Sequence, residues 1–248
     1  MKKSNKLILL LFTLVLALSL SVPAFAKEAP ANAGTFTIKS KVTSQYVKIH
    51  KPVHKAFYYK GETIPCKVTF QDVWKDYYTQ PAIVLFDAKD KDIDALDCGK
   101  VLDHGTEVVC QGKFPTTKLR NGKYSIMAIG FAADKKGNYI KDGSIFETSN
   151  VDITLRTLAA PTSFTAKAAR KKVSIAFKKA TGAKKCEIYH STKKTSGFKK
   201  IATITATKYT DKKVRKGKRY FYKVRSLRTG NGTAKSSYTK TVRTGKVK

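Results

Sequence analysis

The chain has 248 residues, with 50 Lys and Arg against 17 Asp and Glu, a formal net charge of +33 and four cysteines. Four cysteines are too few for a scaffold held together by many disulfides. The charge is uneven, because residues 159–248 hold 27 Lys and Arg against only two acids, Glu187 and Asp211. Repulsion among so many like charges does not stabilise a fold, so we expect a negatively charged partner for this part of the chain.

Residues 1–26 have the pattern of a secretory signal peptide. Three lysines precede an apolar run over residues 7–20, and the small-residue pattern Ala24-Phe25-Ala26 follows it. The run is short for a membrane span of about 20 residues, so cleavage after Ala26 is predicted over the alternative of a membrane anchor. With no transmembrane anchor, no cysteine after that site to take a lipid and no sorting tail, the mature protein is expected to be secreted and held to the cell surface or wall by contacts.

The remaining residues, about 220 of them, suit two domains rather than one small sandwich. The boundary is predicted at residues 158–161, where an acid-containing segment gives way to an almost wholly basic one. Helical periodicity is missing, and short β-branched and aromatic runs between turn residues are typical of sandwiches and barrels. We predict an all-β fold of two tandem immunoglobulin-like β-sandwiches, residues 27–158 and 159–248, after a cleaved signal peptide.

The first domain is predicted to contain six strands. They cover residues 35–41, 62–71, 82–89, 106–114, 123–133 and 150–158. Asn-Gly readily takes positive φ, so the run Leu119-Arg-Asn-Gly-Lys-Tyr124 predicts a turn before a strand, and Asp134-Lys-Lys-Gly-Asn138 predicts a second one. Together with Tyr59-Lys-Gly-Glu-Thr63 and Val84-Leu-Phe-Asp-Ala-Lys89, these runs resemble a bacterial Ig-like domain of secreted or surface proteins.

Cysteines and aspartates of the first domain raise two further expectations. Cys98 and Cys110 flank the turn Asp103-His104-Gly105, so a hairpin could place them opposite each other in a disulfide contributing about 3 kcal/mol. The alternative is that all four cysteines are buried thiols.

Five aspartates cluster between residues 87 and 97. An EF-hand loop started at Asp90 would have Ala95 where Gly is needed and Val101 where Glu belongs. We expect a solvated acidic loop, with a looser calcium site or a contact with the basic domain as alternatives.

The second domain is predicted to contain seven short strands, which fit an immunoglobulin-like sandwich. They cover residues 163–168, 172–178, 184–191, 198–205, 208–211, 219–228 and 236–244. Alternation places Val173, Ile175 and Phe177 on one face of the second strand, and Tyr220, Tyr222 and Val224 on one face of the sixth.

Five runs of the second domain resemble, in order and spacing, a bacterial fibronectin type III domain of exported Gram-positive proteins. They are Ala180-Thr-Gly-Ala183, Cys186-Glu-Ile-Tyr-His-Ser191, Phe198-Lys-Lys-Ile-Ala-Thr203, Tyr209-Thr-Asp211 and Lys218-Arg-Tyr-Phe-Tyr-Lys-Val-Arg225. The resemblance implies a non-catalytic spacer or binding module, often beside wall-directed or carbohydrate-directed partners. Phe177 stands where Trp is usual and Cys186 where Tyr is common, so a slightly smaller core is expected.

Catalytic motifs are missing from the sequence. His50 and His54 flank Pro52 in an extended or loop stretch, where their spacing does not present two imidazoles side by side as on a zinc-enzyme helix. No Gly-x-Ser-x-Gly turn holds a nucleophilic serine, and no cysteine has the setting of a catalytic thiol. We therefore predict a protein that is not an enzyme, with no metal site and no cofactor.

The basic surface of the second domain is the predicted functional site. Tyr189, Phe221, Lys223 and Arg225 are expected to face outward on the neighbouring third and sixth strands, with Glu187 as the one acid among them. Aromatics between cations offer a stacking face that suits sugars or unstacked bases, so Tyr189 and Phe221 are predicted to stack. The predicted polyanion-binding residues are Lys171, Lys172, Lys193, Lys194, Lys199, Lys200, Lys212, Lys213, Arg215, Lys216, Lys218, Arg219, Lys223 and Arg225.

Lysine outnumbers arginine in this domain, which predicts charge-based binding without sequence-specific reading of nucleic acid. The expected partner is wall teichoic acid, another polyanionic glycan or extracellular DNA. Two alternatives stay open. The lysines could merely solubilise the domain, or the protein could be a structural or assembly component of an exported complex that binds an acidic partner protein.

Overall fold

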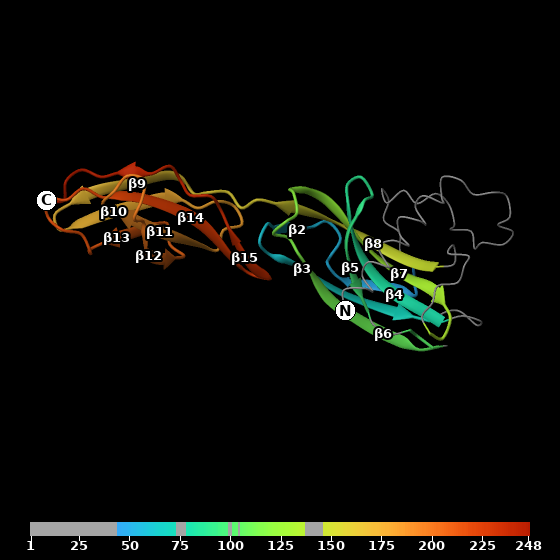
Figure 1. The fold of residues 1–248 in the computed structure, drawn as a ribbon. Coiled ribbons are helices and arrows are strands. Elements are labelled where there is room, and N and C mark those ends of the chain that lie inside the picture. Colours follow the sequence, from blue (N-terminus) through green and yellow to red (C-terminus); the bar gives the residue numbers. More distant parts are fainter. Residues whose placement is uncertain (1–43, 73–77, 99–100, 104, 137–145) are drawn as a thin grey trace. The chain divides into compact units, whose positions relative to one another are not determined.

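The structure is a computed structural model that describes residues 44–72, 78–98, 101–103, 105–136 and 146–248 (Figure 1). The predicted signal peptide and the predicted strand at residues 35–41 lie outside these residues. The chain forms two compact units. Unit 1 consists of the residues up to Tyr58 and of Thr63–Leu155, and unit 2 consists of Tyr59–Glu62 and Arg156–Lys248.

Unit 1 is a sandwich of two antiparallel-paired sheets with a shared apolar core. One sheet has the order β1-β3-β6 and the other the order β2-β8-β7-β4-β5. The strands are β1 (Val47–Lys51), β2 (Ala56–Tyr59), β3 (Thr63–Gln71), β4 (Tyr78–Asp87), β5 (Asp92–Asp97), β6 (Glu107–Pro115), β7 (Gly122–Ala133) and β8 (Phe146–Arg156). Every second residue of β3 is buried, and Ile64, Val68 and Phe70 pack with Ile83 and Ile126 of the other sheet.

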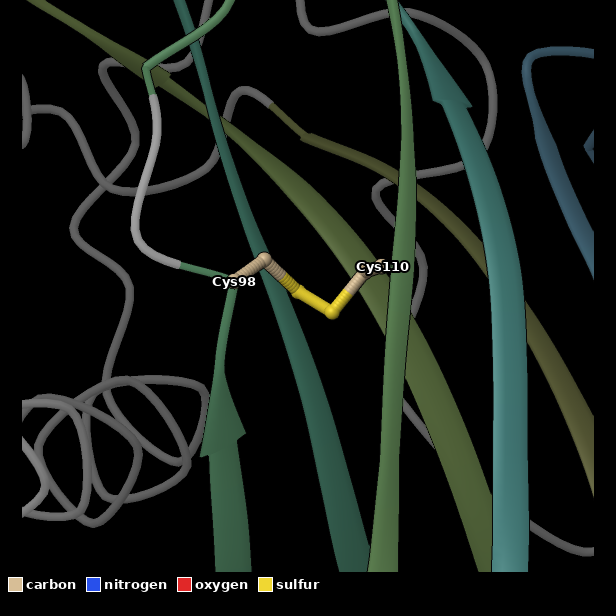
Figure 2. Close-up of a disulfide and its surroundings, with 2 residues drawn as sticks. All are labelled: Cys98 and Cys110. Carbon is tan, nitrogen blue, oxygen red and sulfur yellow. A yellow bond between two sulfur atoms is a disulfide. The ribbon is translucent and has the colours of Figure 1, made fainter.

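A disulfide joins Cys98 and Cys110 in unit 1 (Figure 2). The two cysteines do not face each other across a hairpin, as the sequence had suggested, because β5 pairs with β4 whereas β6 pairs with β3. Cys98 follows β5 of one sheet, and Cys110 lies within β6 of the other. The bond therefore connects the two sheets of the sandwich.

Half of the acidic segment of unit 1 is a strand and not the expected loop. Residues 87–91 form a turn in which Asp87 Oδ1 accepts hydrogen bonds from the backbone N–H groups of Lys89 and Lys91. The chain then continues as β5, in which Ala95 is buried and Ile93 and Leu96 pack against the core. Pairing with β4 explains the strand, because it places Ile93 and Leu96 against the core and Ala95 in a second apolar cluster with residues of β4 and β7.

Unit 2 is also a sandwich of two sheets. One has the order β13-β10-β9 and the other the order β12-β11-β14-β15, with β16 also paired to β14. The strands are β9 (Thr162–Ala169), β10 (Lys172–Lys178), β11 (Lys185–Ser191), β12 (Lys199–Ile204), β13 (Lys208–Asp211), β14 (Phe221–Gly230), β15 (Gly232–Lys235) and β16 (Val242–Arg243).

The core of unit 2 lies between its two sheets. Val173, Ile175 and Phe177 of β10 pack against Ile188 and Tyr222 of the facing sheet. Cys186 is fully buried in the same cluster, so a small hydrophobe and a Phe do fill the inward face. Both units are β-sandwiches, and all regular elements in the described part of the chain are strands. That part contains no helix with the length and apolar composition needed to cross a membrane.

The predicted strand at residues 236–244 is wrong. Strand β15 ends at Lys235, and only Val242–Arg243 pair again as β16. Between them, hydroxyl groups take the place of backbone carbonyls as acceptors. Ser236 Oγ accepts from the Ser226 N–H at 2.8 Å, and Thr239 Oγ1 accepts from the Val224 N–H at 3.0 Å. Ser and Thr side chains compete with ladder hydrogen bonds in this way, which explains the interrupted strand.

Candidate functional site

All three acidic side chains of unit 2 are buried. Their exposed fractions are 4% for Glu62, 5% for Glu187 and 1% for Asp211. Each one contacts a positively charged or titratable side chain: Arg228 Nε lies 2.8 Å from Glu62 Oε1, Arg225 contacts Glu187, and His190 contacts Asp211. Buried charges require such partners, so these three acids are part of the paired interior of unit 2 and not of its surface. The surface of unit 2 therefore carries no acidic side chain.

Glu187 lies at the centre of a hydrogen-bonded network between β11, β12 and β14. Arg225 Nε donates to Glu187 Oε2 at 2.6 Å, the Tyr189 hydroxyl donates to the same oxygen at 3.0 Å, and Lys200 Nζ lies 3.3 Å from Oε1. Burial acts to raise the pKa of Glu187, but the hydrogen bonds from Arg225, Tyr189 and Lys200 outweigh it and hold the pKa below its ordinary value. Glu187 is thus ionised, and it neutralises part of the charge of Arg225 and Lys200.

Asp211 ends β13 and fixes the start of the following loop. His190 Nδ1 and the Tyr222 hydroxyl each lie 2.8 Å from Asp211 Oδ2, and the Lys213 N–H donates to Oδ1 at 2.8 Å. Burial acts to raise the pKa of Asp211, but the hydrogen bonds to His190, Tyr222 and Lys213 hold it below its ordinary value. Asp211 is therefore a structural anion that anchors the loop 212–220.

Three loops of unit 2 and its last residues meet at one end of the sandwich. Val173 at the start of β10 pairs with Asp211 at the end of β13, so the turn before β10 lies beside the loop 212–220. Ser191 at the end of β11 pairs with Phe221 at the start of β14, so the loop 192–198 lies at the same end. The label C in Figure 1 marks this end.

Thirteen cations and no acid lie in these loops, at the first residue of β10 and in the last residues, and we call this set the end cluster. Its members are Arg170, Lys171, Lys172, Lys193, Lys194, Lys212, Lys213, Arg215, Lys216, Lys218, Arg219, Lys246 and Lys248. All of them are exposed. Ten of the fourteen predicted polyanion-binding residues belong to the end cluster.

Hydrogen bonds order the backbone beneath the end cluster. The Lys171 N–H donates to the Lys248 carbonyl at 2.9 Å, and the Gly217 N–H donates to the Val247 carbonyl at 2.8 Å. In the loop 212–220, the Arg215 N–H donates to the Tyr220 hydroxyl at 3.0 Å. The cations therefore project from a connected backbone, and a ligand would find them already gathered.

The other four predicted binding residues lie on β12 and β14, on or beside the outer face of the five-stranded sheet of unit 2. Strand register pairs Glu187 with Arg225 and Tyr189 with Lys223, as the sequence reading requires. Lys200 and Lys199 begin β12, and Lys199 pairs with His190. Phe221 is half-buried and pairs with Ser191 and Arg243.

Two aromatic residues that the sequence reading did not select complete this face. Lys223 Nζ lies 4.3 Å from the centre of the Phe198 ring and 3.9 Å from that of Tyr238. The guanidinium carbon of Arg225 lies 4.9 Å from the centre of the Tyr238 ring and 5.4 Å from that of Tyr189. We call Tyr189, Phe198, Lys223, Arg225 and Tyr238 the face cluster.

Within the face cluster, rings and cations contact one another. Tyr189 and Tyr238 meet edge to face with ring centres 5.2 Å apart. Burial, together with hydrogen bonds to Tyr238 and Glu187, raises the pKa of Tyr189 to about 12, so its hydroxyl stays protonated. Tyr189 therefore holds Arg225 in place, in addition to its predicted role as a stacking platform. Phe198 directly precedes β12 and Tyr238 lies between β15 and β16, so neither is in a strand and strand alternation could not have indicated them.

His50 and His54 have structural partners. His50 Nε2 lies 2.9 Å from Thr69 Oγ1, and His54 Nδ1 accepts from the Asp152 N–H at 3.2 Å. No group of three His, Cys, Asp or Glu side chains that could hold a metal ion occurs among the described residues.

No family model and no curated protein matches the chain. Similar solved structures include an Fn3-like protein from Clostridium thermocellum, 27% identical over 36% of this chain and 94% of its own, with a TM-score of 0.34. A two-domain fibronectin type III segment of chicken tenascin is 9% identical over 79% of this chain and 96% of its own, with a TM-score of 0.34. A beta-1,2-glucanase from Parabacteroides distasonis is 16% identical over 82% of this chain and 36% of its own, with a TM-score of 0.33.

Proposed function

We propose that the protein is a secreted, non-catalytic binding protein of the cell surface, in which unit 2 attaches to an anionic polymer. The observation that carries the proposal is that every acidic side chain of unit 2 is buried and paired, while thirteen exposed cations gather at one end. Secretion rests on the predicted signal peptide at residues 1–26. The resemblance of unit 2 to bacterial fibronectin type III modules of exported proteins supports the same setting.

The end cluster fits a polymer better than a small anion. Its cations are exposed and come from separate loops, so they can contact several charges that follow one another along a chain. Each contact with a polymer phosphate releases condensed counterions, which makes the affinity fall steeply with salt. Ordered backbone beneath the cluster lowers the entropy that binding has to remove.

The side chains of the end cluster also favour charge over sequence reading. Ten of its members are lysines, which act as hydrated point charges, and the three arginines are Arg170, Arg215 and Arg219. The cluster lies on loops and contains no element shaped to enter a nucleic-acid groove. Wall teichoic acid or another polyanionic glycan is therefore the proposed ligand, with extracellular DNA as a second polymer that the same charges would hold.

The test compares two variants of the full mature chain that carry the same net charge. In the first, Lys212, Lys213, Lys216 and Lys218 of the end cluster are replaced by Gln. In the matched control, the exposed Lys178, Lys184, Lys185 and Lys235 outside the cluster are replaced by Gln. Binding to a glycerol phosphate polymer, duplex DNA and a neutral glycan is measured over a salt series.

The unmodified protein should bind both polyanions at low salt and leave the neutral glycan unbound. A plot of log affinity against log salt has a negative slope, and in the end-cluster variant this slope should be less steep by about three to four units. Each lost phosphate contact removes a little less than one unit. The control variant should change it much less. Equal effects of the two variants, or no polyanion binding in dilute salt, would overturn the proposal. Capture of one defined acidic protein by a chain that ignores both polymers would favour the assembly alternative.

A further inference from the structure

Lys223 is half-buried, and its ammonium group makes no hydrogen bond and no ion pair with any described residue. Its neighbours on the same face differ: Arg225 and Lys200 both contact Glu187. Lys223 is held instead by two rings, with Nζ 4.3 Å from the centre of Phe198 and 3.9 Å from that of Tyr238. A cation–π contact fixes the position of an ammonium group without neutralising its charge.

Three features therefore meet at this point of the outer sheet face. The ammonium group is fixed in place, its charge has no counter-ion among the described residues, and apolar ring surface lies beside it. Tyr238 is 36% exposed, so part of that ring surface is open to a ligand. Glu187, the one acid of this face, is already bound by Arg225, Tyr189 and Lys200 and cannot serve Lys223 as well.

We propose that Lys223 is a ligand site for one acidic group of a carbohydrate or polyol polymer, with Tyr238 contacting the carbon skeleton that carries this group. The proposal rests on the proposed function and deepens it, because it names the ligand class. The end cluster recognises charge alone. Lys223 with its rings recognises a phosphate or carboxylate attached to a sugar or polyol, and it distinguishes such a polymer from a chain that consists of phosphate only.

The test uses the full mature chain with Lys223→Met, in which the methionine side chain keeps an apolar stem between the two rings. The matched control is Lys240→Met, which removes an exposed lysine from the neighbouring segment. Two probes of equal charge are compared: a short glycerol phosphate oligomer and an inorganic polyphosphate chain. A third variant, Tyr238→Leu, removes the exposed ring and leaves the charge unchanged.

The unmodified chain should bind the glycerol phosphate oligomer more tightly than polyphosphate. Lys223→Met should weaken oligomer binding about tenfold, as expected for the loss of a fixed charge-assisted contact, and Lys240→Met less than twofold. Tyr238→Leu should remove the preference between the probes. The ring proton signals of Tyr238 and Phe198 in the unmodified protein should shift on titration with the oligomer, a measurement that needs no variant.

Failure of this inference and failure of the proposed function give different results. Should both probes bind equally, with Lys223→Met no weaker than Lys240→Met, the ligand site at Lys223 is wrong while attachment through the end cluster stands. Tighter binding of duplex DNA than of the oligomer, lost with Lys223→Met, would assign the site to nucleic acid instead. Absence of all polyanion binding would remove both proposals together.

Discussion

Arg225 Nε lies 2.6 Å from Glu187 Oε2, where β14 and β11 place the two residues directly opposite each other. The pair fixes a buried carboxylate beneath the face cluster. Replacing Glu187 with Gln should destabilise unit 2 by about 2 kcal/mol, because Arg225 and Lys200 then lose their counter-charge. Urea unfolding measures this loss of stability, and hydrogen exchange of the β11 and β14 amides assigns it to unit 2. Lys200→Gln, which removes only an outer partner of Glu187, should cost clearly less, and equal costs would contradict the central role of the Arg225 contact.

The stability of unit 2 should fall in acid. The pKa values of Glu187 and Asp211 are held below their ordinary values in the folded protein. A carboxyl with a lowered folded pKa contributes stability that is present above its unfolded pKa and is lost as the pH falls through the folded value. The urea midpoint should therefore be steady near neutral pH and should decrease below pH about 4, where unfolded carboxyls begin to bind protons.

Asp211→Asn supplies the control for this pH dependence. The variant should be less stable than the unmodified protein at neutral pH, because the contacts with His190 and Lys213 lose their charge. Its further loss of stability between pH 5 and pH 2 should be smaller, since one of the two carboxyls no longer titrates. An acid dependence that Asp211→Asn leaves unchanged would show that other groups cause it.

Breaking the disulfide should affect unit 1 alone. The double replacement of Cys98 and Cys110 by Ser should lower the stability of unit 1 by about 3 kcal/mol, the chain-entropy value for so short a loop. Unit 2 should unfold as before. In the native protein, thiol reagents should label none of the four cysteines, because Cys66 and Cys186 are buried and burial raises the pKa of both. Unfolding without reduction should expose two thiols, and four would refute the bond.

Ser236→Ala should destabilise unit 2 by about 1–2 kcal/mol. The Ser226 N–H donates to Ser236 Oγ at 2.8 Å in a buried position, and its loss leaves this donor without that acceptor. Ser237→Ala is the matched control, because the side chain of Ser237 is exposed and should change the stability little. Thermal unfolding of both variants in the same buffer makes the comparison, and equal transition temperatures would mean that another acceptor replaces the hydroxyl.

Sequence patterns predicted the strands that have a clear two-residue alternation. β10 and β13 have the predicted bounds, β3 and β7 differ from theirs by one residue at one end, and β6 is shifted by one residue. Strand β1 was missed because it is short and rich in charged and exposed residues, and β2 because it has only four residues. β5 was missed because its aspartates outweighed the apolar contribution of Ile93, Ala95 and Leu96. In each of these cases tertiary packing decides a segment whose local preference is weak.

The sequence predicted most of the residues of the candidate site but not how they are arranged in space. The charge imbalance identified the basic loops, yet their meeting at one end follows from the sheet order, which the sequence alone does not specify. The outward position of Lys223 and Arg225 was correct, because it depends on parity and on the pairing of β11 with β14. The burial of Glu187 could not be predicted, since it depends on Arg225, Tyr189 and Lys200 covering the carboxylate together.

The absence of surface carboxylates on unit 2 also governs how two copies of this unit interact. Two such units have no complementary charges to exchange, so at low ionic strength they repel each other in every relative orientation. An added polyanion removes this barrier and can bridge several copies. The density of unit 2 on a surface would thus depend on the polymer that it coats rather than on any affinity between copies of this unit.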